Sequence, residues 1–377
     1  SEYPYQSVFS TSEGYFLFDG TRYPTGINTP SLINPNLTWE KSTTKNLGFD
    51  FTFLQSRLTF TADIFERKVT DILIPGGKDY PALIGDDDLP FENAGILKTT
   101  GFELQAKWSD KLANGFRYSV GVALSDDKAK VVSYPSNPTN KIGDGVLYKG
   151  YTVGDIWGYV TGGILQEGDF DGVGANGKPL YHGPYFKGGQ AYPGYIWYQD
   201  LDHDGVITTG LNTVDDPGDR KVIGNNAPRY RYNITANFQY KGFDLDLMFQ
   251  GVGKRDYWLS STSSYWGNGA GSWEVYNNSW TPERTDAKFP MYGSGTGSYA
   301  QTGYLLDASY IKLKQVILGY TFPRALINKI GLEKLRLNLA AYNLFTISDM
   351  PKYYDADYLS DAYPPKRTFS VGIQVGF

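Results

Sequence analysis

Apolar and polar residues alternate along several segments of this chain, and the pattern is clearest between Arg367 and Phe377. Every second residue there is apolar: Phe369, Val371, Ile373, Val375 and Phe377. Because successive side chains of a β-strand point to opposite faces, this segment is predicted to form an amphipathic strand that runs to the final residue. Its apolar face requires apolar surroundings, which either the core of a soluble sandwich or the lipid around an outer-membrane barrel would provide.

The same alternation predicts nine strands. They lie near residues 46–53, 58–74, 102–108, 116–124, 230–240, 243–249, 304–322, 335–339 and 367–377. The apolar phase of the seventh strand slips near Gln315, which indicates a β-bulge. Residues 323–332 are expected to form a short helical turn. Residues 1–45, rich in Tyr, Gly, Pro and Ser, are expected to form a long loop.

The lengths of the connections favour a barrel over a sandwich. Short connections alternate with long ones, the short being 54–57, 109–115, 241–242 and 323–332 and the long 74–98, 131–228, 253–303 and 346–366. Outer-membrane barrels have this arrangement, with short periplasmic turns and long extracellular loops. Residues 131–228 are too many for a simple connection, so this segment is expected to have a function of its own. The sequence therefore predicts an all-β membrane barrel with a periplasmic C-terminus.

Aromatic residues in the strand near 230–240 agree with a membrane barrel. Tyr230, Tyr232, Phe238 and Tyr240 stand towards the two ends of the strand, and Ile234 and Ala236 stand between them. Barrels in the outer membrane carry aromatic girdles on both sides of an apolar band. This strand is therefore predicted to cross the membrane.

The odd number of strands indicates a part of a larger barrel, because bacterial single-chain barrels have an even number. With a periplasmic C-terminus, the strand near 46–53 runs towards the periplasm and needs an upward partner before it. Without one, its edge would leave backbone groups unsatisfied in lipid. Residues 1–377 are therefore expected to form the C-terminal part of a barrel, with further strands outside this chain.

Composition narrows the functional classes. The formal charge is 35 − 40 = −5, which gives no reason to expect nucleic acid as a partner. Cysteine is absent, there are two histidines, and no G-x-S-x-G, P-loop or H-E-x-x-H motif occurs, so an enzyme is not expected. No stretch approaches the ~20 apolar residues of a membrane helix. The chain opens on Ser1-Glu-Tyr-Pro-Tyr5 without a secretory leader, so either the leader has been removed or the chain begins partway through a longer protein.

The sharpest local motif is an acidic loop that begins at Asp200. Carboxylates recur at alternate positions around a glycine, at Asp200, Asp202 and Asp204, before Gly205. This spacing suits Ca²⁺, with the carbonyl of Val206 as a further ligand. An EF-hand has Glu at position 12, where this chain has Leu211, so a closing carboxylate would come from Asp215, Asp216 or Asp219. A structural calcium site formed by this loop is predicted, and an Asx-rich solvated turn is the alternative.

Aromatic residues in the loop near 265–273 are candidates for binding. Tyr265, Trp266 and Trp273 could stack on the C–H faces of sugar rings. The alternative, which we favour, is that these rings pack against neighbouring loops or a protein partner, because exposed Trp and Tyr often anchor interfaces.

Motifs spread along nearly the whole chain resemble the SusC/RagA class of TonB-dependent outer-membrane transporters. Asn34-Pro-Asn-Leu-Thr-Trp-Glu40 and the segment from Asn93 to Leu104 resemble two signatures of that family. Further matching segments follow in family order: 65–73, 154–159, 200–207, 222–225, 310–314, 343–346 and 367–370. One such match would be weak, but this many in order are strong evidence.

The resemblance implies a plugged barrel of 22 strands, of which these nine would be the last part. It further implies that a plug domain and the TonB box precede Ser1. Such transporters work with a SusD-like surface lipoprotein and the TonB complex, and import oligosaccharides or peptides across the outer membrane of Gram-negative bacteria. Phe377 resembles the C-terminal aromatic residue recognised during barrel assembly. A passive porin and a soluble β-rich glycan-binding or adhesive domain are the alternative functions.

Overall fold

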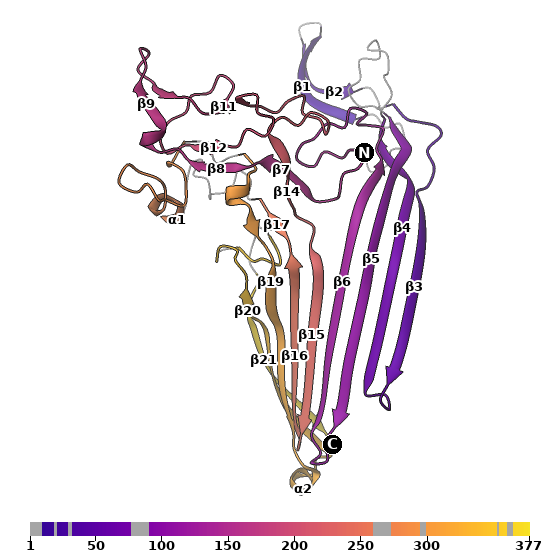
Figure 1. Ribbon diagram of the computed structural model, residues 1–377. Coiled ribbons are helices and arrows are strands. Elements are labelled where there is room, and N and C mark those ends of the chain that lie inside the picture. The colour runs from indigo at the N-terminus through magenta and orange to yellow at the C-terminus, as the bar shows by residue number, and fades with distance from the viewer. Residues whose placement is uncertain are drawn as a thin grey trace.

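The computed structural model describes residues 10–18, 21–28, 32–76, 90–258, 273–294, 299–352, 354–359 and 365–377. Its main element is a nine-stranded antiparallel sheet with the order β21-β20-β19-β16-β15-β6-β5-β4-β3 (Figure 1). The strands are β3 (Lys41–Phe53), β4 (Leu58–Pro75), β5 (Phe91–Lys111), β6 (Arg117–Ser133), β15 (Arg229–Tyr240), β16 (Phe243–Lys254), β19 (Tyr310–Thr321), β20 (Lys334–Ile347) and β21 (Thr368–Gly376). All nine predicted strands are confirmed, and most are longer than the alternation suggested.

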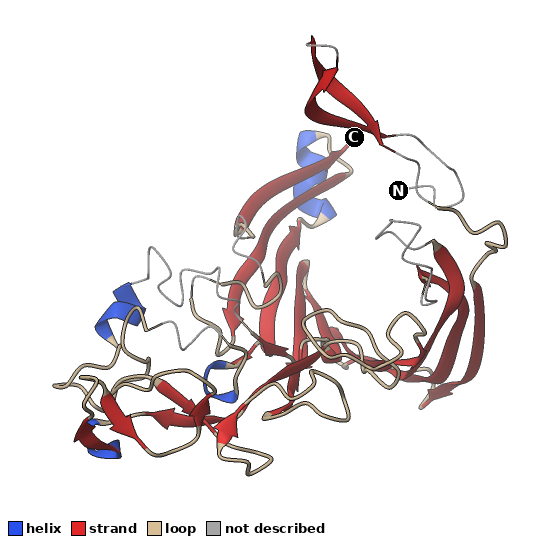
Figure 2. Cartoon of the chain, turned by 90° about the horizontal axis from the view of Figure 1, so that it is seen from above, coloured by secondary structure: helices blue, strands red, loops and turns tan. Residues whose placement is uncertain are grey.

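Seen from above, the sheet forms an open arc whose two edges are β3 and β21 (Figure 2). One face is apolar and exposed along its whole width. On β3 it presents Leu47, Phe49, Phe51 and Phe53, each 45–54% exposed, and on β21 it presents Phe369, Val371 and Ile373, each 66–74% exposed. We call this the apolar face and the opposite one the polar face. Soluble monomers rarely expose an apolar surface of this extent.

The predicted bulge is confirmed. The pairing of β19 shifts between Leu313 and Gln315 against β20, and the pairing of β16 with β19 shifts at the same height, between Met248 and Phe249. Lys314 is the extra residue, because Leu313 pairs with Phe249 and Gln315 pairs with the next residue, Met248. Lys314 and Gln315 therefore both lie on the polar face without the usual reversal, which explains the slip in the sequence pattern.

Aromatic side chains gather at the end of the sheet where the connections are short. Phe116 lies 6.0 Å from Tyr118 and 6.2 Å from Phe238, measured between ring centroids. Farther round the arc, Phe243 lies 4.4 Å from Tyr320. These rings form the girdle expected at one boundary of an apolar band.

The described parts of the long connections all lie at the opposite end (Figure 1). The short end holds the turns and a helical segment made of α2 (Arg324–Ile327) and a 3-10 turn (Asn328–Ile330), as predicted. At the end with the long connections, regular structure begins earlier in the chain than predicted. Residues 1–45 are not all loop, because β1 (Ser10–Phe18) and β2 (Thr21–Asn28) pair as an antiparallel hairpin. Gly and Pro in this segment concealed the strand pattern, since both are depleted in strands.

The long connections form a loop platform with short ladders of its own. Its strands are β7 (Asp155–Tyr159), β8 (Thr161–Ile164), β9 (Phe170–Val173), β10 (Pro179–Tyr181), β11 (Tyr185–Phe186), β12 (Ile196–Tyr198), β13 (Val206–Ile207), β14 (Arg220–Asn225), β17 (Asp256–Tyr257) and β18 (Leu306–Asp307), and its helix is α1 (Trp273–Asn277). Around them lies a buried cluster of Tyr159, Ile196, Tyr198, Ile207, Val275, Phe289 and Tyr304. The segment 131–228 is therefore structured and shares a core with residues far along the chain.

Two of the sequence motifs contact each other at the upper ends of the first strands. The side-chain amide of Asn93 accepts a hydrogen bond from the Thr38 N–H at 2.8 Å and donates to the carbonyls of Thr38, at 2.8 Å, and Asp71, at 2.7 Å. Asp71 has a positive φ of 59°. Asn93 thus fixes the segment before β3 to a kink in β4. These contacts explain why the motif at 34–40 and the motif that begins at Asn93 occur together.

Among the described residues, no helix is both long and apolar enough to cross a membrane.

A charge placed on the apolar face is expected to destabilise the fold far more than one on the polar face. Ile64 is 57% exposed on the apolar face of β4, and Gln105 is exposed on the polar face of β5. In phospholipid vesicles, I64R should lower the free energy of unfolding by about 2–4 kcal/mol, because Arg is costly near the bilayer midplane, and Q105R by under about 1 kcal/mol. Denaturant titration measures both. Equal effects of the two substitutions would contradict the assignment of faces.

Candidate functional site: an acidic loop and a charge network

The acidic loop is folded by its own carboxylates. Asp200 accepts hydrogen bonds from the N–H groups of His203, at 2.6 Å, and Gly205, at 2.9 Å. His203 and Gly205 both have positive φ, 63° and 85°, which lets the backbone turn around the Asp200 carboxylate. Asp204 accepts from the N–H of Val206 at 2.8 Å, and Val206 then pairs with Tyr185 in a parallel ladder.

Asp219 closes the loop from a distant point of the chain. Its side chain is fully buried, and its two oxygens accept the N–H groups of Leu201, at 2.8 Å, and Thr208, at 2.7 Å. One carboxylate oxygen from each of Asp200, Asp202 and Asp219 lies within 4.8 Å of the others. Asp204 and Asp215, two other predicted ligands, lie outside this cluster of three.

The electrostatics of the cluster favour a cation. Asp202 is exposed, but desolvation by the surrounding loop raises its pKa, and the carboxylates of Asp219 and Asp204 raise it further against the opposing hydrogen bond from the Asp204 N–H. Burial also acts to raise the pKa of Asp200, but the N–H groups of Gly205 and His203 outweigh it and hold that pKa below its ordinary value. Ca²⁺–oxygen distances of about 2.3–2.6 Å allow ligand oxygens up to about 5 Å apart, so the geometry fits the ion. The hydrogen bonds equally describe an Asx-rich turn, and calcium binding stays a prediction.

Of the predicted aromatic residues, Trp273 is described, whereas Tyr265 and Trp266 lie outside the described residues. Trp273 begins α1 and is 78% exposed. Its ring meets that of Tyr276 edge to face at 5.8 Å, and Tyr276 meets Tyr292 in the same way at 5.8 Å. The three rings form an exposed aromatic surface at the margin of the loop platform.

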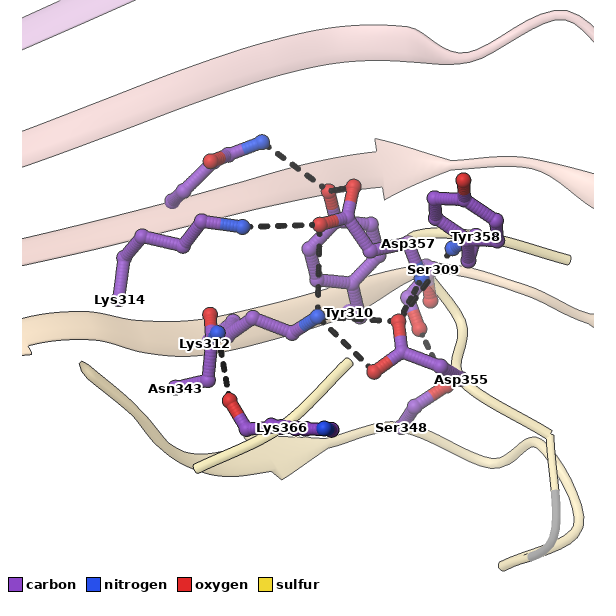
Figure 3. Close-up of polar contacts among 11 residues, drawn as sticks. Ser309, Tyr310, Lys312, Lys314, Asn343, Ser348, Asp355, Asp357, Tyr358 and Lys366 are labelled. Atoms are coloured by element: carbon purple, nitrogen blue, oxygen red, sulfur yellow. Dashed lines mark hydrogen bonds and ion pairs between the residues drawn. The ribbon is translucent and has the colours of Figure 1, made fainter. Parts of the chain in front are cut away.

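A charge network lies where the polar face meets the loops (Figure 3). Lys312 of β19 is 1% exposed, and its ammonium group lies 2.9 Å and 3.0 Å from the two oxygens of Asp355 and 3.3 Å from Asp357. Lys314 also reaches Asp357 at 3.3 Å, and the Tyr310 hydroxyl donates to Asp357 at 2.7 Å. Both aspartates belong to the connection between β20 and β21, so the network holds this connection against β19.

Apolar packing reinforces the same contact. Val252, Ala308, Tyr310, Met350, Ala356 and Leu359 form one buried cluster. Burial tends to raise the pKa of Asp357, but the Tyr310 hydroxyl and the two lysines outweigh it and hold that pKa below its ordinary value. A buried ammonium needs such partners, since an unpaired charge is very costly away from water.

The sequence interpretation missed this network although it contained a signal. Tyr310 and Lys312 alternate along the polar side of a strand next to a long connection, and segment 310–314 was noted only as a family motif. Charges that are repeated near the end of a strand require partners, and Asp355 and Asp357 follow in the next long connection.

Phe377 ends the chain directly after β21 and is 88% exposed. Its role as an assembly signal stays a prediction.

A family model described as TonB dependent receptor-like, beta-barrel matches residues 5–344. The chain belongs to this family. The match covers most of the chain, from the hairpin before the sheet into β20, so the nine-stranded sheet is part of a TonB-dependent receptor barrel and its polar face corresponds to the lumen. The resemblance inferred from the motifs is thereby confirmed, and the family implies an outer-membrane location.

Curated relatives are also named TonB-dependent receptors. TonB-dependent receptor P3 of Formosa agariphila is 28% identical over 401 residues, which cover 99% of this chain and 38% of the relative. TonB-dependent receptor SusC of Bacteroides thetaiotaomicron is 26% identical over 400 residues, which cover 100% of this chain and 36% of the relative. The chain thus spans less than two fifths of the length of these relatives. These relatives are named as receptors and not as enzymes.

Solved structures show the same fold. The RagAB peptide importer in its open-open state matches with a TM-score of 0.74 and 21% sequence identity, covering 100% of this chain and 38% of that chain. The structure entitled RagAB peptide transporter matches with a TM-score of 0.71 and 20% identity, covering 100% of this chain and 39% of that chain. At this identity the likeness concerns the fold alone.

Removal of the buried lysine is expected to free the β20–β21 connection. K312M removes the lysine that pairs with Asp355 and one of the two lysines that pair with Asp357, and should lower the free energy of unfolding by about 3–5 kcal/mol. The control K314M removes a lysine whose side chain is 35% exposed and should cost under about 1 kcal/mol. Limited proteolysis of the intact protein, read out near residues 348–359, measures the release. Equal protection in K312M and the parent protein would contradict a holding role for this network.

Proposed function

We propose that the chain forms the C-terminal part of the barrel of an active outer-membrane importer that takes its energy from the TonB complex. Its nine strands supply one side of the wall around the transport path, and the loop platform lies on the extracellular side. The observation that carries this proposal is the family match, combined with long connections that all lie at one end of the sheet.

The lumenal surface supports a polar cargo, oligosaccharide or peptide. A depression on the polar face is lined by the charged side chains of Lys107 and Asp246 and by uncharged side chains that both donate and accept hydrogen bonds, among them Gln105, Ser119, Asn233, Thr235, Asn237 and Gln315. Such uncharged groups suit the hydroxyl groups of sugars and the amide groups of peptides equally. One of the similar structures is entitled a peptide importer, which gives a reason to test peptides first.

A SusD-like surface lipoprotein is the proposed partner, and it would cap the loop platform. Trp273, Tyr276 and Tyr292 offer an exposed aromatic surface there. Tyr and Trp are enriched at protein interfaces because their rigid rings bury a large area. Packing against the partner is favoured over stacking on sugar.

Loss of TonB is the test of energised import. In a strain without TonB, uptake of the cargo is expected to fall to background, because an active importer cannot open without energy from the inner membrane. Growth on defined oligosaccharides and defined peptides as the sole carbon source identifies the cargo class. Uptake that continues unchanged without TonB would show a passive porin instead.

We further propose that Asp200, Asp202 and Asp219 hold a structural Ca²⁺ that stabilises the acidic loop. The carbonyl of Val206 and water would complete the oxygen ligands that calcium requires. The ion would relieve the repulsion between the three carboxylates. It would have no part in the chemistry of transport.

Calorimetric titration of the intact protein with Ca²⁺ tests this site. D202N removes one charged ligand of the cluster and should weaken binding about tenfold, the change produced by about 1.4 kcal/mol of lost ligation. D215N is the matched control outside the cluster and should leave affinity unchanged. If D215N weakens binding and D202N does not, the ligand set is wrong; an absence of any heat and of any stabilisation by Ca²⁺ rejects the site.

A further inference from the structure

Lysines form two rows across the apolar face, near the upper ends of β3 to β6. The pairing register places Thr43, Lys68, Lys98 and Lys130 directly opposite one another on four successive strands. Two residues lower, the same register aligns Lys45, Glu66, Thr100 and Lys128. We call these eight residues the lysine rows. They contain five lysines and a single glutamate.

The lysine rows share a face with the residues that contact lipid. Two residues below Lys45 lies Leu47, which pairs with Ile64, and Ile64 pairs with Phe102. Because side chains alternate along a strand, the lysines point to the same side as these apolar residues and away from the lumen. Their ammonium groups are accessible, since Lys45, Lys68, Lys128 and Lys130 are exposed.

The height of the rows coincides with the boundary of the apolar band. A band about 25 Å tall, crossed by strands tilted about 40° that rise about 3.3 Å per residue, takes about ten residues of each strand. The lower boundary is marked by Trp108, whose indole N–H donates to the Tyr118 hydroxyl at 3.2 Å. Counting about ten residues up β5 from Trp108 leads to Lys98, and the same count up β4 from Leu58 leads to Lys68. Both lysines are therefore placed at the level of lipid head groups.

Like charges directly opposite each other destabilise a sheet unless something neutralises them. Within the lysine rows, the acidic residues are too few to neutralise the lysines. Glu66 pairs with Lys98 at 2.7 Å and lies within electrostatic reach of Lys45 and Lys68 as well. One carboxylate is thus shared by three lysines, and Lys130 lies one strand farther from it, opposite Lys98. Net charge of this size at a membrane boundary attracts anionic head groups.

We propose that the lysine rows bind phosphate groups on lipids of the outer leaflet. The occupant is a membrane lipid because the rows continue the lipid-facing surface directly, at head-group height. The phosphates would lie between Lys68, Lys98 and Lys130 and neutralise the charge that the single carboxylate of Glu66 leaves in the lysine rows. This inference rests on the proposed function in one respect, since the outer-membrane orientation places the rows in the outer leaflet.

Titration of the detergent-solubilised intact protein with diphosphoryl lipid A tests the proposal, with binding followed by native mass spectrometry. Each lysine near the surface contributes about fivefold to affinity, so K98Q should weaken binding about fivefold and the triple variant K68Q/K98Q/K130Q on the order of a hundredfold. Enzymatically dephosphorylated lipid A should bind as weakly to the parent protein as diphosphoryl lipid A does to the triple variant.

Matched controls separate charge from fold. K107Q removes a lysine from the polar face of the same strand, β5, and should leave affinity unchanged. The variant K68R/K98R/K130R keeps the charge and should bind about as well as the parent, which guards against a folding defect in the glutamine variant. Unchanged affinity in the triple glutamine variant overturns the proposal, and so does inorganic phosphate that competes as strongly as the lipid. Uptake that is independent of TonB, together with intact lysine-dependent lipid binding, would reject the importer and leave this inference standing.

Discussion

Backbone hydrogen bonding in a lipid environment is the constraint on which the rest of this structure depends. Hydrocarbon offers no partner for an N–H or a carbonyl group, so strands must pair with one another across the whole membrane. The nine strands meet this demand by joining neighbours in the chain through antiparallel ladders. Once pairing is fixed, the alternation of side chains divides each strand between lipid and lumen, and the short and long connections fall at opposite ends of the sheet.

The alternation made the membrane sheet predictable from sequence. Phe49 and Phe51 against Asp50, or Val371 and Ile373 against Gly372, define the two faces without any structure in hand, and the slip at Gln315 correctly located a bulge. The upper ends of the strands, towards the long connections, were less predictable. Lys68, Lys98 and Lys130 continue the same face, but polar residues on both sides of a strand remove the signal that marks its end.

The loop platform could not be predicted in the same way, because its core depends on contacts between distant segments. Tyr198 and Phe289 lie in the same cluster although about ninety residues separate them, and their local surroundings are rich in Gly and Pro. The acidic loop could be predicted in part. Its local spacing predicted Asp200, Asp202 and Asp204 as ligands, whereas the structure brings Asp200 and Asp202 together with Asp219, one of three candidates that only the fold could separate.

The charge network and the packing around it connect the loop platform to the nine-stranded sheet. Tyr257, Leu306 and Tyr354 pack against both the platform cluster and the cluster that contains Tyr310. The Tyr257 hydroxyl also donates to the carbonyl of Leu359 at 3.0 Å, in the same connection that Lys312 holds. Displacement of the platform must therefore either carry the upper end of β19 with it or separate a buried ion pair from its partners. Because a buried ammonium group is costly to separate from its carboxylates, the network fixes the β20–β21 connection and the platform that packs on it to the upper end of β19.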